Sequence, residues 1–241
     1  MIDPHGIEYW LVRLRNRISL RLARKGDREH PRVFIMGHPH TATTVLARLF
    51  EANGYNSQHT SRRWRTGAHE CFADRGNYQP LDLLRATYPN SMFILNTRPS
   101  LHYVRNRLDR QVRKCLRKGR NRPRFSERFI RGEILRHNAF LLEFAEASRG
   151  RDDFLVFNIE SPGGFQFMAD WMGLEGAPEA RPYSGGRYLS DEESSLIDQA
   201  YESLGVAGER LNPFVIPDLV PPESRKNLAA FLEEHRDRIR L

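Results

Sequence analysis

The sequence predicts an α/β fold built on a mainly parallel central sheet. Three short runs, residues 32–36, 92–97 and 154–159, are almost continuous in apolar side chains, which is typical of parallel strands buried on both faces. Between them lie segments whose apolar residues recur at helical spacing. Strands that alternate with helices in this way indicate a three-layer arrangement in which helices flank the sheet.

The N-terminal part is predicted to form an amphipathic helix over residues 5–25. Arginines surround its one apolar stripe, which consists of Ile7, Leu11, Leu14, Ile18 and Leu22. Docking on the domain, attachment to a membrane surface and contact with a partner helix are all open. The predicted organisation is a basic helix in residues 1–30, an α/β core in 31–178 and a helical extension packed on that core in 179–241.

The remaining helices follow from the same periodicity. A helix over residues 43–53 follows the first strand, and the Asn53-Gly54 pair ends it. Residues 55–80 have a mixed pattern and are expected to be rich in loops. Further helices are predicted over residues 81–87, 101–118, 127–148 and 165–172, the last one closed by Gly173.

The chain changes character beyond Pro178. Ser190 and Glu193 begin a helix with the pattern of a capping box, and a proline-bearing stretch leads to a terminal amphipathic helix around 223–239. For this part we expect structural packing or an oligomer contact, such as that of a homodimer, rather than chemistry.

The composition points to an anionic partner. The 241 residues carry a net charge of +8, and arginine, which binds phosphate and sulfate in bidentate geometry, far outnumbers lysine. The sequence has no zinc-ligand spacing, no RNP-like aromatic pattern and no helix-turn-helix pattern. Specific binding of nucleic acid is therefore not predicted.

The chain is expected to be cytoplasmic. Cys71 and Cys115 stand far apart and outside any motif, so we interpret them as free thiols in a reducing compartment, with a single disulfide as the alternative. No apolar run approaches the roughly 20 residues that span a bilayer, and the N-terminus lacks an apolar signal core. The basic N-terminal helix leaves peripheral association with a membrane open.

The first strand leads into a predicted anion site. A polar loop follows Gly37, and Thr43 and Thr44 then open the helix. The first backbone N–H groups of a helix lack internal partners, and the helix dipole places partial positive charge there. The loop is not a Walker A loop, because no lysine lies between Gly37 and Arg48.

A second basic group is expected at the same place. Ligands of parallel sheets bind beyond the carboxyl ends of the strands, and this rule brings together the loops at residues 37–44, 97–106 and 160–164. Arg98 directly follows the second buried strand. We therefore expect Arg98 to face the same anion as the loop 37–44.

Three segments resemble the P-loop-like sulfotransferases, whose donor is 3′-phosphoadenosine 5′-phosphosulfate (PAPS). Their phosphosulfate loop is similar to FIMGHPHTATT, and their 3′-phosphate segment is similar to YPNSMFILNTRPSLHYVRN. Their His-Asn helix, following strand and closing helix are similar to RHNAFLLEFAEASRGRDDFLVFNIESPGGFQFMADWMGL. Order, spacing and polarity agree over residues 32–175, and the resemblance implies a three-layer P-loop-like fold.

The resemblance also implies site residues. Backbone N–H groups of the loop would hold the 5′-phosphosulfate, and the two threonines would add side-chain contacts. Arg98 would bind the 3′-phosphate, and Asn106 stands where the family has a partner serine; an amide can also donate to phosphate. The residues that match the phosphosulfate loop are Pro39, His40, Thr41, Ala42, Thr43 and Thr44.

Two loop positions depart from the family pattern. His40 replaces the Arg or Lys that stabilises the bridging oxygen as the sulfuryl group leaves, and Ala42 replaces a glycine. If the backbone at residue 42 needs a positive φ, alanine costs roughly 1 kcal/mol. Nearby negative charge would favour the protonated imidazole of His40, which could then donate to the departing phosphate. The alternative is that His40 only caps the loop of a weakly active or inactive relative.

The acceptor side needs a general base but no metal. His59 is the first candidate, since the family often carries a histidine shortly after the first helix. Glu70 and Asp74 are weaker candidates. Trp64 and Tyr103 either line a pocket or belong to the core.

The helix predicted over residues 101–118 is dense in arginine. A solvated face is one interpretation of this pattern. Steering of the polyanionic donor, or docking of an anionic acceptor such as a glycan or a lipid headgroup, is the other. His102 and His137, which lie within predicted helices, are assigned to packing or capping.

The leading hypothesis is a PAPS-dependent sulfotransferase that acts on a hydroxyl or amine of a small-molecule, glycan or lipid acceptor. The alternatives are a non-catalytic sulfotransferase-like binding protein and a P-loop kinase-type nucleotide-dependent transferase. Binding of adenosine 3′,5′-bisphosphate separates the kinase-type alternative from the other two, because an ATP enzyme gains nothing from a 3′-phosphate.

Overall fold

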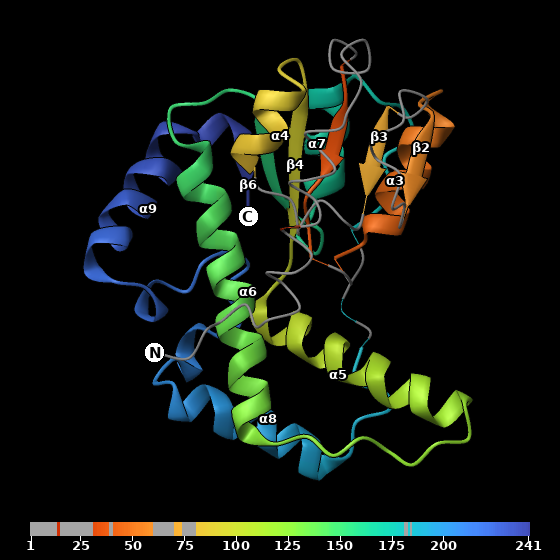
Figure 1. Cartoon of the computed structure of the whole chain (residues 1–241), viewed down its shortest axis with the longest axis vertical. Coiled ribbons are helices and arrows are strands. Elements are labelled where there is room, and N and C mark those ends of the chain that lie inside the picture. Colours follow the sequence, from red (N-terminus) through yellow and green to blue (C-terminus); the bar gives the residue numbers. More distant parts are fainter. Residues whose placement is uncertain are drawn as a thin grey trace.

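The computed structural model describes Leu14 and residues 31–38, 41–59, 70–73, 81–180, 183 and 185–241. These residues form a three-layer α/β fold around a six-stranded parallel sheet with the order β2-β3-β1-β4-β5-β6, which confirms the predicted fold class (Figure 1). The predicted N-terminal helix over residues 5–25 lies outside the described residues, except for Leu14.

The predicted strands are confirmed, and three further strands join them. The strands are β1 (Val33–Ile35), β2 (Ser57–His59), β3 (Cys71–Ala73), β4 (Met92–Thr97), β5 (Phe154–Asn158) and β6 (Ile239–Arg240). The expectation of loops throughout residues 55–80 is wrong for β2 and β3. Both strands have only three residues, and β2 is polar, so neither gives a long apolar run.

The predicted helices agree with the structure to within one or two residues, except at the C-terminal end. The helices are α3 (Thr43–Ala52), α4 (Leu81–Thr87), α5 (Ser100–Arg117), α6 (Glu127–Ser148), α7 (Gly164–Met172), α8 (Asp191–Ser203) and α9 (Pro222–Glu234). Three short 3-10 helices span Ala207–Glu209, Pro217–Leu219 and Arg236–Arg238. The helix predicted around 223–239 is therefore too long, because the chain leaves α9 for the 3-10 turn and β6.

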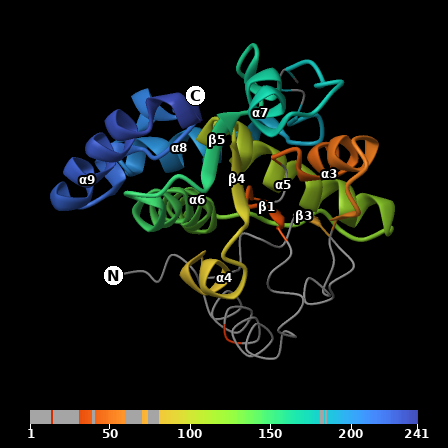
Figure 2. The same cartoon turned by 90° about the horizontal axis from the view of Figure 1, so that it is seen from above.

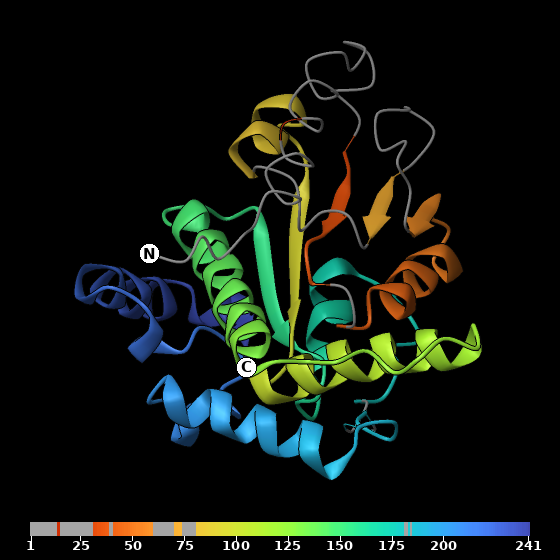
Figure 3. The ribbon, with the colours of Figure 1, turned by 60° about the horizontal axis from the view of Figure 1, so that its bottom comes forward.

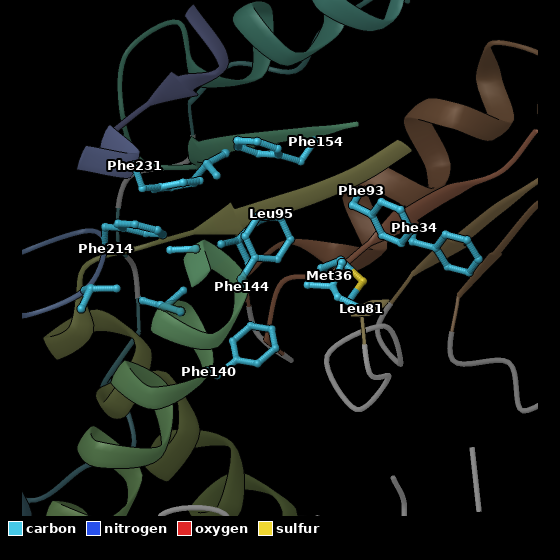
Figure 4. Close-up of a cluster of buried hydrophobic side chains, with 14 of the residues drawn as sticks. Phe34, Met36, Leu81, Phe93, Leu95, Phe140, Phe144, Phe154, Phe214 and Phe231 are labelled. Atoms are coloured by element: carbon cyan, nitrogen blue, oxygen red, sulfur yellow. The ribbon is translucent and has the colours of Figure 1, made fainter. Parts of the chain in front are cut away.

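Successive strand residues face opposite sides of the sheet, and each side has its own helices. Phe34, Phe93 and Phe154 pack with α4, α6 and α9 (Figure 4). Ile35 and Ile94 pack with α3 and α7 on the other face. Figure 2 shows both helical layers with the sheet between them. No helix in the described ranges is long and apolar enough to cross a membrane.

A third cluster lies beyond the carboxyl ends of the strands. It joins α5, the first half of α6 and α8 through buried residues that include Val104, Ile134 and Ile197 (Figure 3). The capping box predicted for α8 is present, because Ser190 Oγ accepts from Glu193 N and Glu193 Oε2 accepts from Ser190 N.

The sheet order reverses beside β1. The chain passes from β1 to β2 on one side, and α4 then carries it from β3 across to β4 on the other. In open parallel sheets, ligands bind in the crevice at such a reversal, outside the carboxyl ends. Because β1 pairs directly with β4, the loop after β1 and the residues after β4 lie at this point.

Asn96 of β4 fixes the loop after β1. Its Oδ1 accepts from Gly37 N at 3.0 Å, and its Nδ2 donates to the carbonyl and to Oγ1 of Thr41. Gly37 has no room for a side chain, because a Cβ there would lie 2.1 Å from Asn96 Oδ1. Thr41 Oγ1 in turn donates to the His38 carbonyl at 2.6 Å. The amide thus joins the two central strands across the site.

Ala42 begins α3 in a left-handed conformation. Its φ is 65°, the one positive φ of a non-glycine residue in the described chain. Its carbonyl accepts from Val45 N and Leu46 N, which starts the helix. The backbone at residue 42 therefore has the positive φ that the sequence analysis considered. An L-residue is strained there, because its Cβ contacts its own backbone.

We predict that Ala42→Gly raises the free energy of unfolding by about 1 kcal/mol, because glycine adopts positive φ without this contact. Urea denaturation measures the change. Ala47→Gly, in the middle of the same helix, is the matched control and lowers stability by about 1 kcal/mol or more. A loss of stability in both variants would contradict the strain assigned to Ala42.

We predict that Asn96→Ala lowers stability by about 1–3 kcal/mol, because the buried N–H of Gly37 loses its acceptor. Amide exchange gives a local readout, since the Gly37 amide should lose protection together with that of Thr41. Asn121→Ala, at an exposed position of the α5–α6 linker, is the control. Unchanged exchange at Gly37 would disprove the anchoring role of Asn96.

Candidate functional site

The N-terminus of α3 is open at the carboxyl edge of the sheet. Within the described ranges no side chain caps it, and its first turn holds no acidic residue. Backbone N–H groups and the dipole of α3 therefore offer positive potential, which no carboxylate of that turn opposes. The helix begins with Thr43 and Thr44, as predicted, and Thr41 lies buried beneath them. Pro39 and His40, also predicted for this site, lie outside the described residues.

His59 lies directly against the two threonines. Its Nε2 is 2.9 Å from Thr44 Oγ1 and 3.3 Å from Thr43 Oγ1. His59 is the last residue of β2, so the connection β1–α3–β2 brings it back to the helix start. The structure thus brings together the predicted general base and the predicted phosphosulfate threonines, which are fifteen and sixteen positions apart in the chain.

The other candidate bases are placed less favourably. Glu70 precedes β3, at the amino end of the sheet, and its Oε2 accepts from Asn56 N at 2.9 Å. This position does not favour Glu70 as the general base, because the candidate site lies at the carboxyl ends of the parallel strands, at the opposite edge of the sheet. Asp74 and Trp64 lie outside the described residues.

Arg98 leaves the end of β4 and is buried at the carboxyl edge. Only 7% of the residue is exposed, and its Nη2 lies 3.1 Å from Glu160 Oε1. Burial lowers the pKa of Arg98, and the charge of Glu160 opposes this effect; an arginine remains protonated in either case. Arg98 Nε has no hydrogen-bond partner in the part of the chain that the structure describes. A cation with a spare donor therefore stands beside the loop after β1.

Glu160 joins Arg98 to a histidine of α5. Its second oxygen, Oε2, lies 2.6 Å from Nδ1 of His102. The ring of His102 stacks on Tyr183 with centroids 4.1 Å apart and an angle of 4°. Burial raises the pKa of Tyr183 to about 12, so its phenol stays neutral at physiological pH. Sequence reasoning missed Glu160 and Tyr183; an acid just after the third buried strand is the signal that could have found Glu160.

Asn106 lies in the second turn of α5 and packs against Gly185. A Cβ on Gly185 would come within 1.8 Å of Asn106 Oδ1, so glycine is required for this close approach. The predicted partner of Arg98 therefore contacts the chain that carries Tyr183.

A buried aromatic cluster packs next to the loop after β1 and the start of α5. Tyr103 stacks on His137 at 4.1 Å, and His38 meets both rings from the loop after β1. Burial lowers the pKa of His137 to about 3; the charge of Arg98 acts in the same direction and the Arg98 backbone opposes it. His137 is thus neutral and serves packing, as predicted. Tyr103 is buried and belongs to the core.

The cysteines and possible metal ligands were the remaining candidates for chemistry. Cys71 and Cys115 are free thiols, as predicted, and burial raises the pKa of Cys71 to about 12. Among the described residues, no three His, Cys, Asp or Glu side chains are grouped so as to hold a metal ion.

Comparisons of the chain with protein-family models, with curated proteins and with solved structures each find no match. The function proposed below therefore depends on the residues of this site and on their geometry.

Proposed function

We propose that the protein transfers a sulfuryl group from PAPS to a hydroxyl or amine of a small-molecule, glycan or lipid acceptor. The observation that carries the proposal is the meeting of three groups at one sheet edge. These are the open N-terminus of α3, the His59 ring against its threonines, and Arg98 at the end of the adjacent strand.

The α3 end suits the phosphosulfate of the donor. Its first N–H groups and the hydroxyls of Thr43 and Thr44 can donate hydrogen bonds, and an anion supplies several lone pairs at once. Because α3 has no acidic first turn, a divalent anion meets no repulsion there. The loop lacks the Walker lysine, which neutralises the terminal phosphates of ATP. The sulfuryl end of PAPS carries less negative charge than the terminal phosphate of ATP, so this loop suits PAPS better than ATP.

Arg98 suits the 3′-phosphate. Its ion pair with Glu160 holds the guanidinium in place and leaves Nε as a further donor. Charge-assisted hydrogen bonds to phosphate are among the strongest that a side chain makes. The 3′-phosphate distinguishes PAPS from ATP, so this contact would select the donor.

His59 would act on the acceptor. Its Nε2 takes the proton of the acceptor hydroxyl while the acceptor oxygen forms a bond to sulfur. The bond between sulfur and the bridging oxygen breaks, and its electron pair leaves with the 5′-phosphate as adenosine 3′,5′-bisphosphate. By the resemblance, His40 in its protonated form would stabilise this leaving oxygen. The mechanism needs no metal, since the helix end and the basic side chains supply the positive charge.

A non-catalytic binding protein is the second candidate. The observation that favours it is the pair of departures at His40 and Ala42, of which the second is accommodated in the structure at the expense of a positive φ. Ligand binding and turnover separate the two candidates.

We predict that the protein binds adenosine 3′,5′-bisphosphate more tightly than ATP or adenosine 5′-monophosphate, and that Arg98→Ala abolishes the preference for the 3′-phosphate. The expected loss is about tenfold to a hundredfold in affinity, as for a charge-assisted contact. Calorimetric titration with the three nucleotides measures it. Arg98→Lys keeps the charge and serves as a second variant if the alanine variant folds poorly.

Arg85→Ala is the matched control for this prediction. Arg85 is 8% exposed and is paired with Asp153 at 2.9 Å, but Asp153 precedes β5 and so lies at the opposite edge of the sheet. This variant should lose stability and keep the nucleotide preference. An Arg98→Ala protein that still prefers the 3′-phosphate would contradict the proposal that Arg98 binds this phosphate.

We predict that His59→Asn lowers the rate of sulfuryl transfer by about 10²–10⁴ and leaves the affinity for adenosine 3′,5′-bisphosphate within a few-fold. The measurement is release of the bisphosphate from PAPS with a phenol, a glycan and a hydroxylated lipid offered as acceptors. Gln58→Asn, one residue earlier on β2 and on the other face by strand alternation, is the control. A wild-type protein that binds the bisphosphate and transfers to none of these acceptors would favour the non-catalytic candidate instead.

A further inference from the structure

The basic excess of the chain is concentrated in one segment. Residues 105–124 contain ten Arg and Lys residues and one acid, Asp109, whereas the net charge of the whole chain is +8. The rest of the molecule is thus close to neutral. This segment comprises most of α5 and the linker to α6.

Four basic residues of α5 lie on one helical face. Arg110, Arg113, Lys114 and Arg117 are spaced by three and four residues, so their side chains follow one another along the helix, and all four are exposed. We call this row the basic ridge. The opposite face of α5 is buried: Leu108 packs in the cluster with α6 and α8, and Val112 is fully buried.

The basic ridge continues outward from the candidate site. α5 starts two residues after Arg98 and carries His102 and Asn106 on its first turns. It then runs from the end of β4 past the edge of the sheet (Figure 1 and Figure 3). The helix has 18 residues and is therefore about 27 Å long. A linear ligand laid on the ridge would have its end at the candidate site.

The outer part of the ridge is not neutralised by the protein. Elsewhere in the segment, Arg107 pairs with Glu133 and Arg122 with Glu193. For Arg113, Lys114 and Arg117 the described part of the chain provides no ion pair. The linker adds further exposed basic residues beside the helix, namely Lys118, Arg120 and Arg124.

The chemistry of the ridge selects among polyanions. A membrane-bound helix needs an exposed apolar face, but the apolar face of α5 is buried and Leu116 is its one exposed large hydrophobic residue. Single-stranded nucleic acids are held by stacking successive bases on aromatic rings as well as by charge. Residues 104–124 contain no aromatic side chain, and Tyr188, whose N–H donates to Asp109, adds one exposed ring beside the segment rather than a row of rings along it. A polymer that is recognised by its charges alone and carries hydroxyl groups fits the ridge best.

We propose that the basic ridge docks an acidic polysaccharide, a chain of carboxylated or sulfated sugars, and that such a chain is the acceptor of this protein. The part of this inference that concerns the acceptor rests on the proposed function. Docking itself depends only on the exposed charges of α5.

The test compares two triple variants of the full chain. The ridge variant carries Arg113→Gln, Lys114→Gln and Arg117→Gln. The matched control carries the same charge change at exposed positions on other elements: Arg149→Gln, Lys226→Gln and Arg240→Gln. The probes are a short heparin oligosaccharide, a uridine-only RNA of matched charge and vesicles that contain phosphatidylserine.

The ridge variant should bind heparin about tenfold more weakly than wild type, as expected for the loss of three exposed ion pairs, and its affinity should depend less on salt. The control should stay within twofold. Equal losses in both variants would overturn docking on the ridge. Tighter binding of the RNA or of the vesicles than of heparin by wild type would overturn the choice of a polysaccharide.

Titration with adenosine 3′,5′-bisphosphate keeps the two proposals apart. Both triple variants should bind this nucleotide like wild type, because none of the substituted residues belongs to the donor site. If the bisphosphate does not bind to wild type, the proposed function fails, whereas heparin binding that depends on the ridge still supports docking. Heparin that binds on the ridge and accepts no sulfuryl group from PAPS, in a protein that transfers to a phenol, would overturn the acceptor assignment.

Discussion

Parallel pairing of β1 with β4 is the constraint on which the site depends. It sets Ile35, the last residue of β1, opposite Ile94, and β4 continues three residues further to Thr97. The end of β4 therefore lies beside the loop after β1. Asn96 then ties the loop after β1 to β4 through bonds to Gly37 and Thr41. The direction of α3, the position of Arg98 and the return of β2 with His59 all follow from this arrangement.

Several charges lie together at that edge and partly compensate one another. Arg98 would be costly to bury alone, and Glu160 compensates it within the protein. The same carboxylate also binds His102, so one acid serves two basic groups. The α3 end adds positive potential that no described acid cancels. Of these groups, the α3 end is the one whose positive potential is not matched by a carboxylate in its own first turn.

The sequence could predict the elements that carry strong periodicity. Their apolar patterns made β4, β5, α4 and α6 predictable, because these patterns are clear and end at recognisable signals, such as Ser126 before α6. The sequence could not predict β2 and β6, since strands of only two or three residues are defined by the neighbour they pair with. The sequence could predict that His59 and Thr44 belong to one site, but not that they are in contact. The 2.9 Å contact depends on the angle at which the chain returns after α3, and no local pattern encodes that angle. Glu160 as the partner of Arg98 likewise depends on the pairing of β4 with β5.

Charge is unevenly distributed over the described part of the molecule. Ten basic residues and one acid lie on and beside α5, at the end of the sheet where the strands terminate. In the field of a large anionic surface, such a molecule experiences a torque that turns α5 toward that surface before any contact forms. At physiological ionic strength this alignment acts only within a few multiples of about 8 Å. Diffusional encounters from other directions can thus be converted, at short range, into encounters that present the carboxyl edge of the sheet.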